Sequence, residues 1–184
     1  MSSQALRRAE TAQSPTIIPA IAEDGALFPI EKMAAHRRGL LHQAVSVFVF
    51  SGEEMLIQRR ATGKYHSGGQ WANTCCSHPN WGETVEDAAA RRLHEELGFR
   101  IALKAAHVIT YKAPVGHGLV EHERVQVFYG SADRRTLRIA ADPAEVTQTR
   151  WIARERLQAE IDSSREDFTP WLRIYLERWD ELGF

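Results

Sequence analysis

The sequence predicts an α+β fold, in which helices flank a mixed β-sheet. The first observation is a series of segments with the composition or alternation of strands, at 44–50, 55–60, 101–113, 123–129 and 150–152, of which 44–50 is rich in β-branched and aromatic residues. The second is a set of stretches with helical composition or apolar residues at helical spacing, at 84–98, 153–161 and 170–182. The third is a length of 184 residues without an internal repeat, which suits one domain with a sizeable core.

The N-terminal end is predicted to differ from the rest of the chain. Residues 1–19 are polar, and Pro15 and Pro19 interrupt any periodicity, so we expect a disordered arm there. Residues 20–184 then form the single domain, and its first helix begins near Glu31.

Turn residues separate the predicted strands. Residues 51–54 connect strands 44–50 and 55–60, which we expect to form a hairpin. The glycine-rich residues 61–70 and the segment 114–118 are predicted to be loops.

The helix at 84–98 has both end signals. Thr84 is a suitable N-cap, and Glu86 and Asp87 place negative charge in the first turn, where the helix dipole favours it. Gly98 is suited to the left-handed residue that ends many helices. The charged side chains between them are read either as a solvated face or as part of a site.

Composition excludes several classes of protein. A formal net charge of −1, with 43% hydrophobic and 26% charged residues, is typical of a soluble domain and predicts neither nucleic acid nor membrane as a partner. No apolar run approaches the roughly 20 residues that span a bilayer. The two cysteines are adjacent and cannot build a disulfide framework, so we expect a reducing, cytoplasmic location. We expect a monomer or weak dimer.

Those cysteines, Cys75 and Cys76, precede His78 by a few residues. On an extended segment successive side chains point to opposite faces, so only one thiol can enter a pocket and the other faces the core. Nearby positive charge makes a thiol reactive, whereas a buried thiol is inert. A structural zinc site would need a second Cys/His pair, and no further cysteine exists.

A second group of residues has the chemistry of a metal site. Glu121 and Glu123 are two apart, so an extended segment puts both carboxylates on one side. With three histidines they make a five-donor set that suits Mn²⁺ or Zn²⁺, and Mg²⁺ less well because of its nitrogen content; the histidines are His36, His42 and His78. The alternative is that these histidines are ordinary surface or internally satisfied residues.

Positive charge gathers in and beside the glycine-rich loop. Arg59, Arg60 and Lys64, with Lys32 further away, are a candidate phosphate-binding group. Surface arginines are common, so this pattern alone is weak.

The stretch from Ser77 to Phe99 resembles the Nudix box. The matching positions are Glu83, Arg91, Leu93, Glu95, Glu96, Gly98 and Phe99. Ser77 stands where the box has glycine, and Arg92 stands where it has a glutamate that Nudix hydrolases use to hold Mg²⁺. The resemblance implies a Nudix-type α/β/α sandwich with an N-terminal extension. The exchange at Arg92 fits an enzyme that holds a diphosphate without hydrolysing it.

Further motifs resemble one branch, the type I isopentenyl-diphosphate isomerase family. They are Asn73–Pro79, Lys32–His36 with His42, Arg59-Arg60 with Lys64, Tyr111, Glu121–Glu123 and Thr169–Trp171. The resemblance covers about Phe28 to Leu182 and implies an isomerase that feeds isoprenoid biosynthesis by interconverting isopentenyl and dimethylallyl diphosphate.

The resemblance also implies roles for individual residues. His36, His42, His78, Glu121 and Glu123 would bind one divalent metal, and Glu96 would help hold a Mg²⁺ that arrives with the substrate diphosphate. Lys32, Arg60, Lys64 and Arg92 would bind the diphosphate. Cys76 and Glu123 would be the acid/base pair, with Tyr111 as proton relay and the Trp171 ring against a tertiary carbocation.

Two other functions compete with this reading. A Nudix hydrolase of a nucleoside diphosphate derivative would need the intact acidic box, which Arg92 interrupts. A non-catalytic module that senses a diphosphate would use the same pocket without turnover.

Overall fold

The computed structural model describes residues 15–184. Its sheet has nine strands, and its central path runs β2 (Leu27–Glu31), β1 (Ile17–Ile21), β3 (His42–Ser51), β4 (Glu54–Arg60) and β5 (Trp71–Ala72). The other four strands attach to this path: β6 (Cys75–Ser77) and β8 (Leu119–Ser131) to β3, β7 (Lys104–Gly116) to β8, and β9 (Val146–Ala153) to β4. Because β3 runs parallel to β8 and antiparallel to β6, the sheet is mixed, as predicted.

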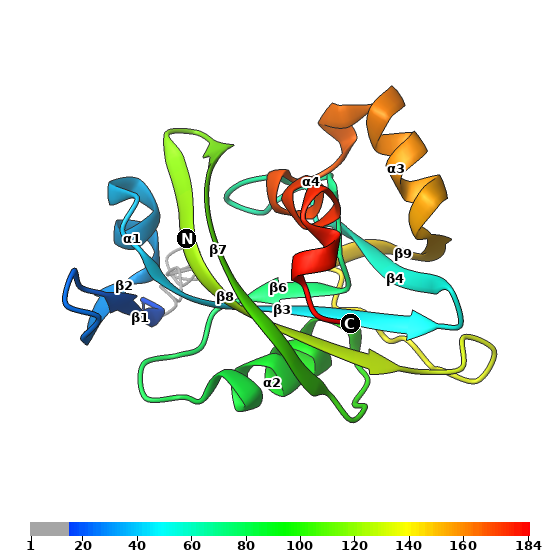
Figure 1. Ribbon diagram of the computed structural model, residues 1–184, viewed down its shortest axis with the longest axis horizontal. Coiled ribbons are helices and arrows are strands. Elements are labelled where there is room, and N and C mark those ends of the chain that lie inside the picture. The colour runs from blue at the N-terminus through cyan, green and yellow to red at the C-terminus, as the bar shows by residue number, and fades with distance from the viewer. Residues whose placement is uncertain (1–14) are drawn as a thin grey trace, which may run out of the picture.

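Helices cover both faces of this sheet (Figure 1). The helix α2 (Val85–Leu97) lies on one face, and α3 (Arg154–Ser163) and α4 (Pro170–Glu177) lie on the other. The short α1 (Lys32–Arg38) follows the β1–β2 pair at one end. Short 3₁₀ turns at Arg165–Asp167 and Trp179–Glu181 bracket α4. The predicted α/β/α sandwich is confirmed.

Two apolar cores hold the layers together. One lies under α2, where Leu93 and Leu97 pack with Val47 and Phe128 of the sheet. The other lies under α3 and α4, around the fully buried Phe48, Trp171 and Tyr175. Each fully buried side chain of this size contributes about 1.5–3 kcal/mol relative to an exposed one. The strand β3 contributes alternate side chains to the two cores, so it connects the helix layer on one face of the sheet to the layer on the other.

The N-terminal boundary differs from the prediction of a disordered arm over residues 1–19. Ile17–Ile21 forms strand β1 and pairs with β2. The Pro19↔Pro29 pair lies within this ladder, at a position where an antiparallel pair exchanges no N–H···O bonds. The rest of the predicted arm, residues 1–14, is outside the described part of the chain.

The predicted hairpin is correct only at its turn. Strands β3 and β4 pair at Phe50↔Met55 and Ser51↔Glu54 and then separate. Further along, β6 takes the place beside β3 at residues 45–47, and β5 takes the place beside β4 at Gln58 and Arg59, while β9 pairs along the other edge of β4. Tertiary partners therefore replaced the local pairing.

The predicted loop at 114–118 is wrong over its first residues, and the predicted last helix is too long. Strand β7 continues through Pro114 to Gly116, with an irregular register there. Among the described strands β7 pairs only with β8, and proline is tolerated on such an edge. The helix α4 ends at Glu177, and the chain continues as a 3₁₀ turn.

The predicted ends of the central helix are confirmed. Thr84 Oγ1 accepts a hydrogen bond from the Asp87 amide, and Gly98 has a φ of 76°. A Cβ added to Gly98 would lie 2.4 Å from the Ala140 carbonyl oxygen, whereas one added to Gly82, with a φ of 84°, would meet nothing within 4 Å.

We therefore expect Gly98→Ala to cost more stability than Gly82→Ala. The left-handed conformation costs an L-residue about 1–2 kcal/mol at either position, and only Gly98→Ala adds a clash with backbone. Urea unfolding of both variants measures the difference. Equal losses would contradict this account of the helix end.

Candidate active site

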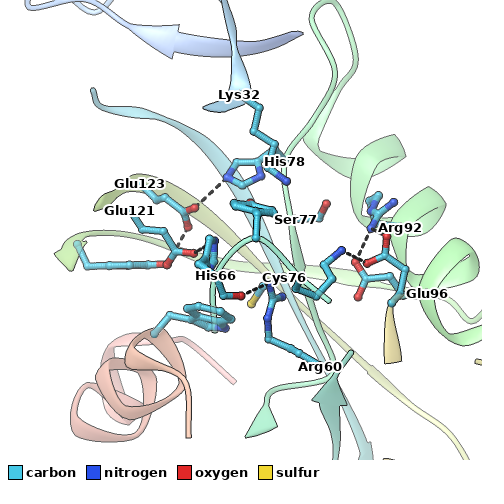
Figure 2. A pocket seen from close by; sticks show the side chains of 15 residues that line it. Lys32, Arg60, His66, Cys76, Ser77, His78, Arg92, Glu96, Glu121 and Glu123 are labelled. Atoms are coloured by element: carbon cyan, nitrogen blue, oxygen red, sulfur yellow. Dashed lines mark hydrogen bonds and ion pairs between the residues drawn. The ribbon is translucent and has the colours of Figure 1, made fainter. Parts of the chain in front are cut away.

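A polar cavity opens where α1, the loop 61–70, β6, β8 and the start of α4 meet (Figure 2). It is lined by Lys32, Arg60, Lys64, Tyr65, His66, Cys76, Ser77, His78, Arg92, Glu96, Tyr111, Glu121, Glu123, Glu145 and Trp171. The structure thus brings together nearly all of the site residues predicted from the sequence. His36 and His42, which are absent from this lining, are fully buried behind it.

One wall of the cavity is a cluster of imidazoles and carboxylates. His36 comes from α1, His42 begins β3, His78 follows β6 and Glu123 lies on β8. One donor atom from each of these four residues lies within 4.8 Å of the others. The closest nitrogen pair is His42 Nε2 and His78 Nε2, 3.2 Å apart.

Backbone contacts orient two of the imidazole rings. His36 Nδ1 lies 2.8 Å from the Lys32 carbonyl oxygen, and His42 Nδ1 lies 2.7 Å from the Leu40 carbonyl oxygen. A carbonyl can only accept, so both Nδ1 atoms carry a proton, and Nε2 is the nitrogen of each ring that can bind a metal. This is how metal-binding histidines are usually oriented.

Burial also keeps imidazoles in the form that binds metals. It lowers the pKa of His36 to about 4 and that of His78 to about 3. Both rings are therefore neutral at physiological pH. His36 Nε2 is buried without a hydrogen-bond partner, an arrangement that costs free energy unless a cation or water satisfies it.

The two carboxylates of β8 complete this wall, on one side of the strand as predicted. Tyr111, opposite Glu123 in the β7–β8 ladder, donates its hydroxyl at 2.9 Å to Glu121 Oε2 and at 2.7 Å to Glu123 Oε2. Burial and the neighbouring Glu123 raise the pKa of Glu121 well above its usual value. Although burial opposes ionisation of Glu123, contacts with His42 and His78 hold its pKa well below its usual value.

This donor set fits a divalent metal. Three clustered imidazoles and two nearby carboxylates supply nitrogen and oxygen ligands of the kinds that first-row metals take. A divalent cation would also offset the repulsion between the carboxylates.

The two cysteines face opposite sides, which confirms the strand alternation. Cys75 is packed in the core under α2, whereas Cys76 lines the cavity. The Cys76 thiol donates to Asn73 Oδ1 at 2.9 Å and lies 3.2 Å from Ser46 Oγ. Burial raises the pKa of Cys76 to about 12, so the group is a neutral thiol.

An aromatic ring closes the cavity on the side of α4. Thr169 caps this helix and places Trp171 in its first turn, where the ring is 1% exposed. The Arg60 guanidinium lies 5.1 Å from the centre of the Trp171 ring. The indole Nε1 is buried without a hydrogen-bond partner, and the face of the aromatic ring is electron-rich.

Positive charge gathers toward the mouth. Lys32 is partly buried, and loss of hydration, reinforced by the charges of Lys64, Arg92 and Arg60, lowers its pKa to about 8. Lys32, Lys64 and Arg92 also line an adjoining groove of about 620 Å³. Lys64 and Arg92 both pair with the Glu145 carboxylate.

Glu96 is the residue of the Nudix-like helix α2 whose carboxylate reaches this cationic mouth. Its Oε1 accepts from Arg92 Nη2 at 2.8 Å, and its Oε2 accepts from Gln58 Nε2 at 2.8 Å. Other charges of the helix lie away from the cavity: Arg91 pairs with Glu83 and Glu95. The solvated-face interpretation is correct for the exposed Glu95, whereas Arg91 and Glu83 are partly buried and Arg91 lines the adjoining groove.

Sequence reasoning missed four cavity residues as parts of the site: Tyr65, His66, Ser77 and Glu145. The first two lie in the glycine-rich loop next to Lys64, and an imidazole beside the basic group was the available signal. Glu145 lies in a polar segment with no distinguishing pattern. Arg59, which the sequence grouped with Arg60, instead donates to the Gly69 carbonyl and does not line the cavity.

Comparison with known proteins first defines the class. A NUDIX domain model matches residues 40–172. The crystal structure of DR0079 from Deinococcus radiodurans aligns with a TM-score of 0.72 at 18% identity, covering 88% of this chain and 98% of that one. The MutT protein of Methanosarcina mazei Go1 aligns with a TM-score of 0.61 at 17% identity, covering 76% and 93%. At these identities the structures show a shared fold.

Curated relatives are much more similar in sequence. A protein of Cereibacter sphaeroides named isopentenyl-diphosphate Delta-isomerase is 53% identical over 163 residues, which cover 88% of this chain and 91% of the relative. A Rhodobacter capsulatus protein of the same name is 48% identical over 170 residues, covering 91% and 95%. The chain belongs to the NUDIX family and, within it, to the isopentenyl-diphosphate Delta-isomerases.

Within residues 15–184, no helix combines the length and apolar character needed to cross a membrane.

Proposed function

We propose that this protein interconverts isopentenyl diphosphate and dimethylallyl diphosphate by moving one proton on and one proton off the five-carbon chain. The observation that carries the proposal is the arrangement of Cys76 and Glu123 around β3. Strand β6, with Cys76, pairs with β3 at residues 45–47, and β8, with Glu123, pairs with it along residues 42–50. Because both side chains line one cavity, an alkene lying over β3 has a proton-transfer group on either side.

The reaction needs these two groups because the proton is added at one carbon and another is lost two carbons away. Addition of a proton to the terminal carbon of the double bond leaves a tertiary carbocation. The cationic carbon has a second neighbour, on the side of the diphosphate. Loss of a proton from that neighbour forms a new double bond, one position along the chain from the original one. Cys76 and the pair formed by Glu123 and Tyr111 supply the two proton-transfer sites.

The carbocation must be stabilised and kept from water. We place it against the face of Trp171, because an electron-rich ring stabilises a cation by about 2 kcal/mol or more in a desolvated site. The ring is 1% exposed and belongs to the first turn of α4. Water in the same place would convert the cation into an alcohol.

The diphosphate is assigned to the mouth, where Lys32, Arg60, Lys64 and Arg92 line the cavity. The carboxylate of Glu145 already pairs with Lys64 and Arg92, so these two side chains are arranged around an anion. Burial acts to raise the pKa of Glu145, but the charges of Lys64 and Arg92 lower it, so Glu145 is ionised. A diphosphate bound there replaces this carboxylate as the anionic partner.

Metals have two separate places in this proposal. The five predicted donors His36, His42, His78, Glu121 and Glu123 would hold Mn²⁺ or Zn²⁺, with Mg²⁺ as the less suited candidate. That ion would hold Glu123 in its reactive orientation and adjust its acidity. Glu96 would contact a Mg²⁺ carried by the substrate diphosphate. We assign the protein to the cytoplasm, because both cysteines are free.

The function is tested by incubating the protein with isopentenyl diphosphate and Mg²⁺ in deuterated water, with NMR detection and a parallel assay of phosphate release. We expect dimethylallyl diphosphate that carries deuterium, with no phosphate released, because the chemistry is proton exchange at carbon. Metal-replete protein that leaves isopentenyl diphosphate unchanged but hydrolyses nucleoside diphosphate derivatives would show a hydrolase instead.

The adjacent cysteines provide a matched pair of variants. Cys76→Ala should lower kcat by about 10²–10⁴-fold, the usual contribution of an acid or base, with unfolding unchanged. Cys75→Ala should keep kcat within a few-fold and cost about 1 kcal/mol of stability, because its sulfur is packed in the core. Steady-state kinetics and urea unfolding of both variants measure this. An inactive Cys75→Ala beside an active Cys76→Ala would reverse the assignment.

A further inference from the structure

His66 is a buried cavity residue that the five-donor set does not include. It lies in the loop between β4 and β5, is 2% exposed and points toward Glu121 (Figure 2). Its Nε2 lies 3.4 Å from Glu121 Oε1, yet this nitrogen has no hydrogen-bond partner. A buried imidazole nitrogen in this state costs free energy comparable to a lost hydrogen bond.

The surroundings of His66 fix its ring in this direction. The Arg60 side chain donates to the His66 carbonyl at 3.2 Å, which holds the loop backbone. The ring packs edge-on against Trp171, with centroids 5.7 Å apart, and against Tyr65, at 4.4 Å. Nδ1 lies 3.3 Å from the Ser67 hydroxyl. The nitrogen left free is the one that faces the imidazole–carboxylate wall.

That nitrogen belongs to a donor group of its own. His36, His66 and Glu121 each offer an atom within 4.8 Å of the others. The first donor group, His36, His42, His78 and Glu123, shares His36 with it. Neither group alone contains the five predicted ligands, because Glu121 occurs only in the group that includes His66. The two groups share His36 and together contain six donors.

We propose that His66 is the sixth protein ligand of the metal centre, an inference that rests on the centre described under the proposed function. Six donors, four imidazoles and two carboxylates, suit an octahedral ion such as Mn²⁺. With metal–ligand bonds of about 2.2 Å, neighbouring donors in an octahedron lie about 3.1 Å apart. The 3.4 Å between His66 Nε2 and Glu121 Oε1 is close to that spacing.

A full set of protein ligands has a chemical consequence. With six protein ligands, no coordination position would remain for water or for substrate, so the ion would orient Glu123 and would not itself activate a water molecule. In a cavity that must exclude water from a carbocation, this closes a route by which the intermediate would be lost.

The test uses Mn²⁺ as the probe and counts the water molecules bound to it. Electron paramagnetic resonance of free Mn²⁺ gives the dissociation constant, and water proton relaxation gives the number of exchanging waters on the bound ion. The proteins compared are the wild type, His66→Ala and the control His94→Ala, whose exposed side chain lies on α2 outside the cavity. Urea unfolding of the metal-free proteins establishes that each is folded.

We expect wild-type protein and His94→Ala to bind one Mn²⁺ in this centre without an exchanging water. His66→Ala should gain one exchanging water and bind Mn²⁺ at least about 10–100-fold more weakly, the loss typical of weakened metal sites. The wild-type water count supports or contradicts the proposal even where the variant does not fold.

Two different results would overturn the assignment. An exchanging water on the wild-type ion, unchanged in number and affinity by His66→Ala, would show that His66 is not a ligand while leaving the five-donor centre intact. Failure of wild-type protein to bind Mn²⁺, Zn²⁺ or Mg²⁺ at the cluster would remove the centre itself, and with it the metal part of the proposed function.

Discussion

The contacts of the Glu123 carboxylate hold together the residues that form the inner wall of the site. This group is 5% exposed and is reached from three other elements: His78 Nε2 at 2.9 Å, His42 Nε2 at 3.5 Å and the Tyr111 hydroxyl at 2.7 Å. Register places His42 and Tyr111 directly opposite Glu123 on β3 and β7. A buried carboxylate is tolerated only when paired, so the sheet and the site constrain each other.

The cavity is divided along its depth. Its inner part combines the Glu123 wall, the Cys76 thiol and the Trp171 ring, all of them buried or nearly so. Its mouth is cationic and continues into the groove beside α1 and α2. A small chain with a diphosphate at one end matches this gradient. In the helix of the NUDIX domain, Arg92 pairs with Glu96 and Glu145 at the mouth, where the box of a hydrolase has a carboxylate.

Those parts of the fold and of the site that depend on local signals could be predicted from the sequence. The ends of helix α2 follow from its capping residues. Backbone periodicity alone gives the opposite orientations of Cys75 and Cys76 and the shared face of Glu121 and Glu123. Other features could not be predicted, because each depends on a partner distant in sequence. They are strand β1, the separation of β3 from β4, and the positions of His66 and Glu145. His66, for example, faces the cluster because Arg60 and Trp171 hold its loop.

The central claim is that the buried imidazoles and carboxylates around Glu123 form a metal centre. Thermal unfolding of purified protein before and after chelation, and after return of Mn²⁺ or Zn²⁺, tests it most directly. A ligand present at about 100 times its dissociation constant stabilises the folded state by about 2.7 kcal/mol, which for a protein of this size is a Tm change of about 5–10 °C. We expect chelation to lower Tm by that amount and the metal to restore it. A Tm that responds to neither treatment would contradict the claim.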